Sequence, residues 1–161
     1  MVVAGIKTIL LAMLVFPLVA GAAGAQAFVQ GSMLQIRQSL TGAPGIISFW
    51  SVDCPPCYKE LSHWKQLKQA FPRLNLILVA TDDLELQDDV EKVLREQGVD
   101  HLPSWQFADD FVQRLRYEVD PLWQGELPRT YLIAPNGDIT GVSGVVDPAQ
   151  VTAWLRQFDK I

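Results

Sequence analysis

The stretch that decides the fold reads Phe49-Trp50-Ser51-Val52-Asp53-Cys54-Pro55-Pro56-Cys57-Tyr58-Lys59-Glu60. It contains the only two cysteines of the chain, spaced as C-x-x-C. An apolar run precedes it and a helical pattern follows it, so the thiols are predicted to lie where a buried strand passes into the first turn of a helix. Unpaired backbone N–H groups and the positive end of the helix dipole stabilise an anion there. Because the thiolate is the reactive form of cysteine, this position favours a redox-active dithiol.

Other interpretations of the cysteine pair fit the sequence less well. A structural disulfide would close so short a loop that it removes little entropy from the unfolded chain. A zinc site needs four ligands, and outside the pair only His63 and His101 offer ring nitrogens, far apart in the sequence. Haem attachment requires a histidine directly after the second cysteine, where Tyr58 stands. A copper(I) module would use the same two thiolates, but no methionine or further histidine lies beside them. We therefore expect a redox dithiol with no metal and no cofactor.

The composition fits one folded domain. The chain has 161 residues, 49% of them hydrophobic, and a formal net charge of −5. A chain of this length buries roughly two thirds of the surface that its unfolded form exposes. An acidic balance without a basic cluster argues against nucleic acid as a partner.

The first 27 residues are predicted to be a targeting segment. Lys7 is the only charged residue before Arg37, and residues 8–20 are almost wholly apolar. Ala25-Gln26-Ala27 fits an A-x-A cleavage site, which would make Phe28 the first residue of a domain covering residues 28–161. The uncharged run is also long enough to cross a bilayer, so a retained membrane anchor is the alternative. Either way we expect an exported, periplasmic domain, in a compartment where disulfides persist.

Hydrophobic periodicity and turn residues predict alternating elements along the domain. The predicted helices cover residues 32–40, 55–71, 82–98, 109–117 and 147–158. The predicted strands cover residues 46–50, 74–80, 104–108, 129–134 and 138–143. Asn136-Gly137 predicts a hairpin between the last two strands. The acidic start of the third helix, at Asp82-Asp83, is expected to be a solvated face. Residues 118–127 are expected to be a loop.

This order predicts the α/β class. Right-handed crossovers would give a mixed β-sheet with helices on both faces, ending in a C-terminal β-hairpin and helix.

Two stretches, about seventy residues apart, resemble the thioredoxin-like superfamily, specifically the exported TlpA/ResA-type thiol–disulfide oxidoreductases. They are Ser48-Phe49-Trp50…Cys54-Pro55-Pro56-Cys57-Tyr58-Lys59-Glu60 and Glu126-Leu127-Pro128-Arg129-Thr130-Tyr131-Leu132-Ile133-Ala134-Pro135-Asn136-Gly137. The resemblance extends from about residue 42 to residue 158 and implies a thioredoxin-like fold.

The resemblance also implies roles for individual residues. Cys54 would be the attacking thiol and Cys57 the resolving thiol. Glu60, one helical turn after Cys57, matches the acidic residue that this group places beneath its thiols, where a carboxylate can relay a proton. The alternative is an exposed glutamate that pairs with neighbours such as His63.

A substrate-binding surface is implied as well. The bond between Leu127 and Pro128 would be cis and would lie against the dithiol, leaving the backbone of Leu127 open to an incoming strand; an ordinary trans bond is the alternative. Trp50, Pro55 and Pro56 would complete this surface.

The chain departs from the family pattern at several positions, two of which bear on the chemistry of the dithiol. Asp53 stands before the first cysteine, where tryptophan is usual, and a carboxylate there would disfavour the Cys54 thiolate. Ser48 stands where thioredoxins have a buried aspartate, so Glu60 would have no second acid beside it.

The resemblance implies an exported enzyme that reduces disulfides of other exported proteins. A membrane thiol reductase would be its electron donor, and apocytochrome c, in cytochrome c biogenesis, is one substrate of that group. A dithiol oxidase of the same fold is the alternative, because about 30 mV in reduction potential shifts the equilibrium by about 1.4 kcal/mol.

Overall fold

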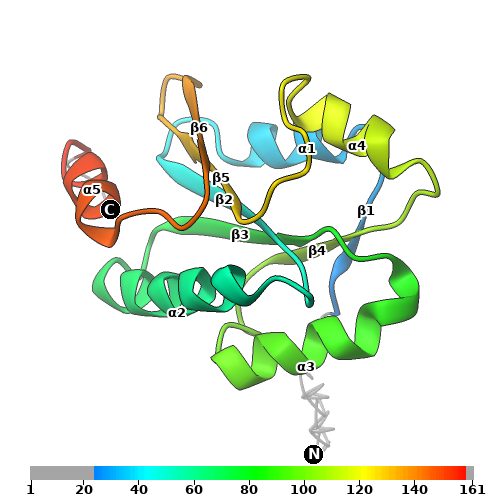
Figure 1. Ribbon diagram of the computed structural model, residues 1–161. Coiled ribbons are helices and arrows are strands. Elements are labelled where there is room, and N and C mark those ends of the chain that lie inside the picture. Colours follow the sequence, from blue (N-terminus) through cyan, green and yellow to red (C-terminus); the bar gives the residue numbers. More distant parts are fainter. Residues whose placement is uncertain (1–23, 159–161) are drawn as a thin grey trace, which may run out of the picture.

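The computed structural model describes residues 24–158, which form a six-stranded sheet in the order β1-β4-β3-β2-β5-β6 with helices on both faces (Figure 1). The strands are β1 Gln26–Phe28, β2 Gly45–Trp50, β3 Asn75–Ala80, β4 Ser104–Phe107, β5 Arg129–Ile133 and β6 Ile139–Ser143. The helices are α1 Ser32–Ser39, α2 Pro55–Ala70, α3 Gln87–Gln97, α4 Val112–Val119 and α5 Pro148–Leu155, with a 3₁₀ turn η1 at Leu84–Leu86 before α3.

The sheet is mixed, as predicted. β2, β3, β4 and β1 run parallel to one another, whereas β5 is antiparallel to β2 and β6 is antiparallel to β5. The parallel β2 and β3 are joined by α2, and β3 and β4 are joined by α3, which is the usual crossover between parallel strands. β5 and β6 form the predicted hairpin, followed by the closing helix α5.

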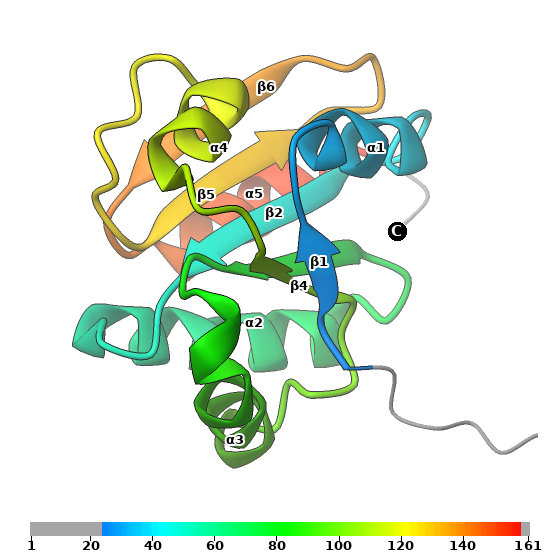
Figure 2. The same cartoon turned by 90° about the vertical axis from the view of Figure 1, so that its right-hand side faces the viewer.

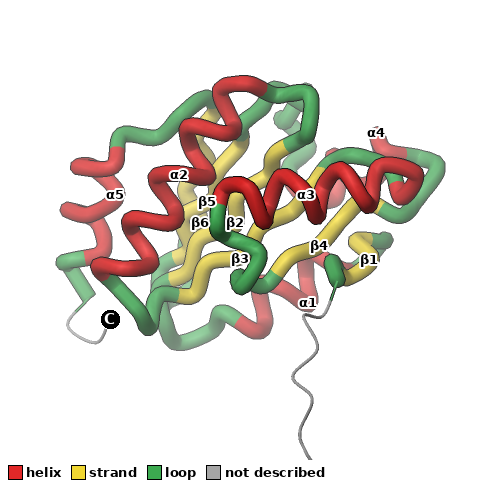
Figure 3. The backbone as a smooth tube through the Cα atoms, turned by 90° about the horizontal axis from the view of Figure 1, so that it is seen from below, coloured by secondary structure: helices red, strands yellow, loops and turns green. Residues whose placement is uncertain are grey.

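Each face of the sheet is covered by its own helices (Figure 3). One core cluster joins alternate residues of β2, such as Ile46 and Trp50, to α2, α3 and α5. The other joins the intervening residues, such as Ile47 and Phe49, to α1 and α4. Successive side chains of a strand point to opposite faces, so β2, buried at every position, is the centre of both cores.

Aromatic rings fill the core on the α1 and α4 side. The Phe49 ring lies 5.0 Å from that of Trp123, 5.9 Å from that of Tyr131 and 6.0 Å from that of Phe28, measured between centroids. Trp123 comes from the segment 118–127, which was expected only to be a loop. Because its side chain is 4% exposed, this ring fixes the loop to the sheet directly before β5.

Strand β1 was not predicted. It pairs with β4 at the edge of the sheet through Gln26↔Trp105, Ala27↔Gln106 and Phe28↔Phe107 (Figure 2). The sequence placed residues 26 and 27 in the targeting segment, most of which lies outside the described residues. In the part of the chain that is described, no helix is long and apolar enough to cross a membrane.

Three other local expectations differ from the structure. The helix expected from residue 82 begins at Gln87, after the 3₁₀ turn η1. α4 begins at Val112 rather than Asp109, because the Asp109 carboxylate accepts the Phe111 N–H at 2.9 Å and forms a turn before the helix. Asp82 is 8% exposed, so the expectation that the pair Asp82-Asp83 is a solvated face is wrong for its first member. Asp83 is exposed and accepts the Glu85 N–H at the start of η1.

Candidate active site

The two cysteines form a disulfide at the start of α2. Cys54 is the N-cap residue, and its carbonyl accepts the Cys57 N–H at 2.9 Å. Pro55 and Pro56 occupy the first helical positions, where proline loses no helical hydrogen bond and its fixed φ suits the helix. The helix therefore begins at the dithiol, as the sequence predicts.

The two sulfur-bearing side chains differ in access. Cys54 is 8% exposed and Cys57 is fully buried, in the core cluster between α2 and the sheet. Pro55 and Pro56 are exposed beside them. Of the two cysteines, only Cys54 therefore has surface open to solvent.

The loop that carries Cys54 is held by two side chains from outside it. Asp82, just beyond the end of β3, accepts the Ser51 hydroxyl at 2.8 Å and the Val52 N–H at 3.1 Å. The Tyr58 hydroxyl donates to the Val52 carbonyl. Burial is the main reason that the pKa of Asp82 lies above its usual value. Both backbone polar groups of Val52 are thus bonded, which fixes the turn that leads into the dithiol.

Glu60 lies in the core, one helical turn after Cys57. It is 1% exposed, and its carboxylate accepts the Ser48 hydroxyl at 3.1 Å, the Thr130 hydroxyl at 3.3 Å and the Val146 N–H at 3.2 Å. The alternative of an exposed glutamate that pairs with His63 is therefore wrong.

Ser48, at the position where the resemblance implies a second acid, is hydrogen-bonded to Glu60. Its oxygen accepts the Trp64 indole N–H at 2.9 Å and its hydroxyl donates to Glu60. The neutral serine leaves Glu60 as the one acidic side chain of this network. Burial raises the pKa of Glu60 above its ordinary value, although the hydrogen bonds from Val146, Ser48 and Thr130 act in the opposite direction.

The bond between Leu127 and Pro128 is cis, as the resemblance implies, and the trans alternative is wrong. Leu127 is partly buried and packs against the core cluster that contains both cysteines. The Glu126 carbonyl accepts the Trp123 indole N–H at 2.9 Å, and the Pro128 carbonyl accepts the Gly144 N–H at 2.8 Å. Between them, the backbone N–H and C=O of Leu127 make no hydrogen bond to any residue from 24 to 158.

Trp50 has a different place from the one expected for a substrate-binding residue. Its side chain is fully buried in the cluster beneath the dithiol. The surface around Cys54 is formed instead by Pro55, Pro56 and Asp53, all of them exposed.

Acidic side chains surround the outer side of the Cys54 loop. Asp53 raises the pKa of both Tyr58 and Asp82, although burial is the larger cause for each. A cleft of about 380 Å³ separates this loop from α3, and its charged lining residues are Asp53, Asp89, Lys92 and Glu96. Three carboxylates and one ammonium give this cleft, which Asp53 lines but Cys54 does not, a net negative charge.

Sequence reasoning missed Asp82, Thr130 and Val146. Asp82 follows β3, and side chains just beyond the carboxyl ends of neighbouring parallel strands gather at one edge of a sheet. Its position after an apolar run was therefore a usable signal. The sequence carries no such signal for the Val146 backbone N–H, because a contact across 86 residues depends on where α5 docks.

A model of the AhpC/TSA family matches residues 28–142. No curated protein matches the chain.

Solved structures share the fold at low sequence identity. A secreted Mycobacterium tuberculosis disulfide oxidoreductase, described as homologous to E. coli DsbE, superposes with a TM-score of 0.60 and 18% identity over 75% of this chain and 86% of that one. StoA from Bacillus subtilis gives a TM-score of 0.53 and 24% identity, covering 71% of this chain and 83% of its own. A thioredoxin-related protein from Neisseria meningitidis gives a TM-score of 0.57 and 24% identity, covering 74% of this chain and 87% of its own. These likenesses confirm the thioredoxin-like fold.

Proposed function

Since the chain belongs to the AhpC/TSA family and has the fold of thiol–disulfide oxidoreductases with a disulfide-bonded C-x-x-C pair, we propose that it reduces disulfides of other exported proteins. The observation that carries the proposal is the unequal setting of the two sulfurs. Cys54 caps the start of a helix and has access to solvent, whereas Cys57 is buried one turn before a buried carboxyl group.

The reaction follows from that arrangement. The Cys54 thiolate attacks one sulfur of a substrate disulfide, a mixed disulfide forms, and the other substrate sulfur leaves as a thiolate. Cys57 then loses its proton and attacks Cys54, which releases the second substrate thiolate and closes the Cys54–Cys57 disulfide. Two electrons pass from the dithiol to the substrate. Glu60, on the same face of α2 as Cys57, accepts the Cys57 proton.

The free backbone of Leu127 supports a protein substrate. An extended segment that carries the disulfide would pair with the Leu127 N–H and C=O in β-augmentation, next to Cys54. Pro55 and Pro56 would border this segment from the α2 side. The substrates we propose are disulfide-containing exported proteins, and a membrane thiol reductase would restore the dithiol.

The acidic surroundings of Cys54 favour the reducing direction. Like charges disfavour the ionised form of a group, so Asp53 and the acidic cleft oppose the stabilisation that the helix start gives the Cys54 thiolate. A less stable thiolate means a less stable reduced state, which makes the dithiol a better reductant. An oxidase would require the opposite balance.

Reduction of insulin tests the proposal. The protein, kept reduced by dithiothreitol, should accelerate cleavage of the insulin disulfides above the rate with dithiothreitol alone. An unchanged rate at equimolar protein and insulin would refute the proposed activity.

We expect Asp53→Asn to shift formation of the Cys54 thiolate to lower pH, because it removes the charge nearest to that cysteine in the sequence. Two unit charges about 6 Å apart interact by about 3 kcal/mol at an effective dielectric constant near 20, before salt screening. Titration of the thiolate ultraviolet absorbance in the reduced variant and the wild type measures the shift. Asp100→Asn, an exposed acidic residue after α3, is the control. Thiolate formation at the same or higher pH in Asp53→Asn would remove the electrostatic argument for the reducing direction.

Export is proposed from the N-terminal segment, as a cleaved signal peptide or a retained anchor, and one structural neighbour is described as secreted. Strand β1 favours a boundary slightly earlier than residue 27. A chain starting at Phe28 would lose the pairs Gln26↔Trp105 and Ala27↔Gln106 and would place a charged amino group on a fully buried residue. Ala23-Gly24-Ala25 also satisfies the A-x-A rule, and cleavage after it leaves β1 complete.

A chain that starts at Gln26 should be more stable than one that starts at Phe28. The loss of two strand pairs, at roughly 0.5–1.5 kcal/mol per hydrogen bond, predicts a difference of about 1–3 kcal/mol in the free energy of unfolding. Urea denaturation of the two purified chains measures the difference. Equal midpoints would show that residues 26 and 27 do not contribute to the folded domain.

A further inference from the structure

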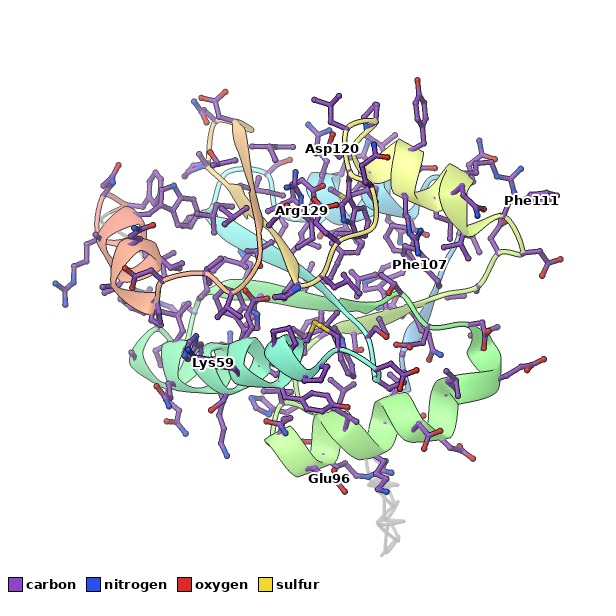
Figure 4. All side chains as sticks on the ribbon, viewed as in Figure 1. Lys59, Glu96, Phe107, Phe111, Asp120 and Arg129 are labelled. Atoms are coloured by element: carbon purple, nitrogen blue, oxygen red, sulfur yellow. A yellow bond between two sulfur atoms is a disulfide. The ribbon has the colours of Figure 1, made fainter. Side chains whose placement is uncertain are left out.

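Arg129 lies directly after the cis proline and is largely buried. It is the first residue of β5, and its side chain is 14% exposed. Its guanidinium uses three nitrogens: Nη2 donates to the Asp120 carboxylate at 2.7 Å, Nη1 to the Ser143 hydroxyl at 2.7 Å, and Nε to the Tyr131 hydroxyl at 3.1 Å. Figure 4 shows Arg129 and Asp120 meeting between β5 and the loop after α4. One cation thus joins β5, β6 and this loop.

The carboxylates around Arg129 belong to the segment that leads into Leu127. Asp120 also accepts the Leu122 N–H at 2.9 Å and the Tyr131 hydroxyl at 3.2 Å. Glu126 accepts the Ser143 hydroxyl at 2.6 Å, and its carboxylate lies 3.8 Å from Arg129. Both ends of the segment 120–126 are therefore held by the same polar cluster.

A glycine on the neighbouring strand makes room for the guanidinium. Gly141 lies opposite Tyr131 in the β5–β6 ladder. A Cβ atom at position 141 would lie 2.5 Å from Nη2 of Arg129 and 3.1 Å from the Tyr131 ring. Any larger residue on β6 would thus displace the guanidinium, since the end of a flexible side chain moves more easily than the backbone.

We infer that Arg129 is a positioning residue for protein substrates: by holding the segment 120–126 against β5 and β6, it fixes the unpaired backbone of Leu127, which packs against the core cluster that contains Cys54 and Cys57. This inference rests on the proposed function. The Glu126 and Pro128 carbonyls, on either side of Leu127, are already bonded, so the remaining freedom of Leu127 is that of the segment as a whole. Arg129 removes that freedom without contacting the dithiol.

Lysine can replace arginine only in part at this position. The planar guanidinium presents its donors in a fixed fork, and here they go to three acceptors on two strands and a loop. A lysine ammonium keeps the charge but carries it at a single point. The arrangement also leaves Asp120, 22% exposed, with an uncompensated charge when Arg129 is removed.

The test compares a protein disulfide with a small one. Rate constants for oxidation of the reduced protein are measured in single turnovers with insulin and with the small aromatic disulfide DTNB, because only insulin can pair with the Leu127 backbone. Arg129→Gln should lower the insulin rate constant about tenfold and leave the DTNB rate constant within about twofold. The insulin rate constant of Arg129→Lys should lie between those of Arg129→Gln and the wild type. The reduction potential of the dithiol should be unchanged in both variants.

Two further variants complete the test. Gly141→Ala keeps every polar group but displaces the guanidinium, and it should lower the insulin rate constant in the same way. Arg114→Gln, which removes the more exposed arginine paired with Asp109, should change neither rate constant. If Arg129→Gln does not fold, Arg129→Lys and Gly141→Ala decide the question. An unchanged ratio of the two rate constants in the folded variants would overturn the inference, whereas a wild-type protein that reacts with neither disulfide would instead overturn the proposed function.

Discussion

Cys54→Ser is expected to abolish disulfide exchange with insulin. Cys54 is the sulfur with access to solvent, whereas Cys57 has no exposed surface and cannot meet a folded substrate. In Cys54→Ser, attack by Cys57 therefore cannot compensate for the loss of the Cys54 thiol. The rate of insulin disulfide cleavage, measured in the presence of dithiothreitol, should fall to the rate with dithiothreitol alone.

Cys57→Ser provides the matched variant. It should keep the attacking thiol and lose the resolving one, so a mixed disulfide with insulin should accumulate and be seen as a mass increase on Cys54. Faster alkylation of Cys57 than of Cys54 in the reduced wild type, or a mixed disulfide that forms only in Cys54→Ser, would show that the roles are reversed.

Glu60→Gln is expected to slow resolution of the mixed disulfide on the order of 10²-fold, the usual contribution of a general base. The amide fits the site: its oxygen can accept the Val146 N–H, and its NH₂ can donate to the hydroxyl oxygens of Ser48 and Thr130. The change therefore removes proton transfer with little change of packing. Rapid quenching of a single turnover with insulin should show the mixed disulfide persisting in the variant. Glu85→Gln, at an exposed glutamate, should resolve it at the wild-type rate.

Although Glu60→Gln should slow the reaction, it should not destabilise the folded protein at neutral pH. Burial raises the pKa of Glu60 above the ordinary 4.5, so the folded state binds its proton more tightly than the unfolded state does. The resulting stability is fully present below pH 4.5 and is lost as the pH rises through the folded-state pKa. Above that pKa, Glu60→Gln should match or exceed the wild type in melting temperature, and the two should converge in acid. A variant less stable than the wild type at pH 8 would show that the ionised carboxylate is well solvated by its three donors.

The sequence was sufficient to predict those elements that local residue patterns specify on their own. The apolar run into Trp50, the prolines after Cys54 and the hairpin at Asn136-Gly137 each predict an element that the structure contains. β1 escaped prediction because three residues next to an apolar leader carry no period of their own; they become a strand only by pairing with β4.

The candidate site shows the same division. The positions of Cys54, Cys57 and Pro128 follow from local motifs, but their environment depends on distant parts of the chain. The sequence predicts Asp82 as an acidic residue at the start of a helix. In the structure it lies just beyond the end of β3, and its carboxylate accepts the Val52 N–H. Arg129 reads as an ordinary first residue of a strand, and only the docking of the segment 120–126 gives its guanidinium three acceptors.

The reduction potential of the Cys54–Cys57 couple tests the central claim most directly. It is measured by equilibrating the protein in dithiothreitol and glutathione redox buffers and counting alkylated thiols by mass. With acidic side chains in the cleft that Asp53 lines, and a buried carboxyl group one helical turn after Cys57, we predict a value more negative than about −200 mV, towards the roughly −270 mV of thioredoxin. A value near the −120 mV of a strong dithiol oxidase such as DsbA would contradict the proposed reducing function.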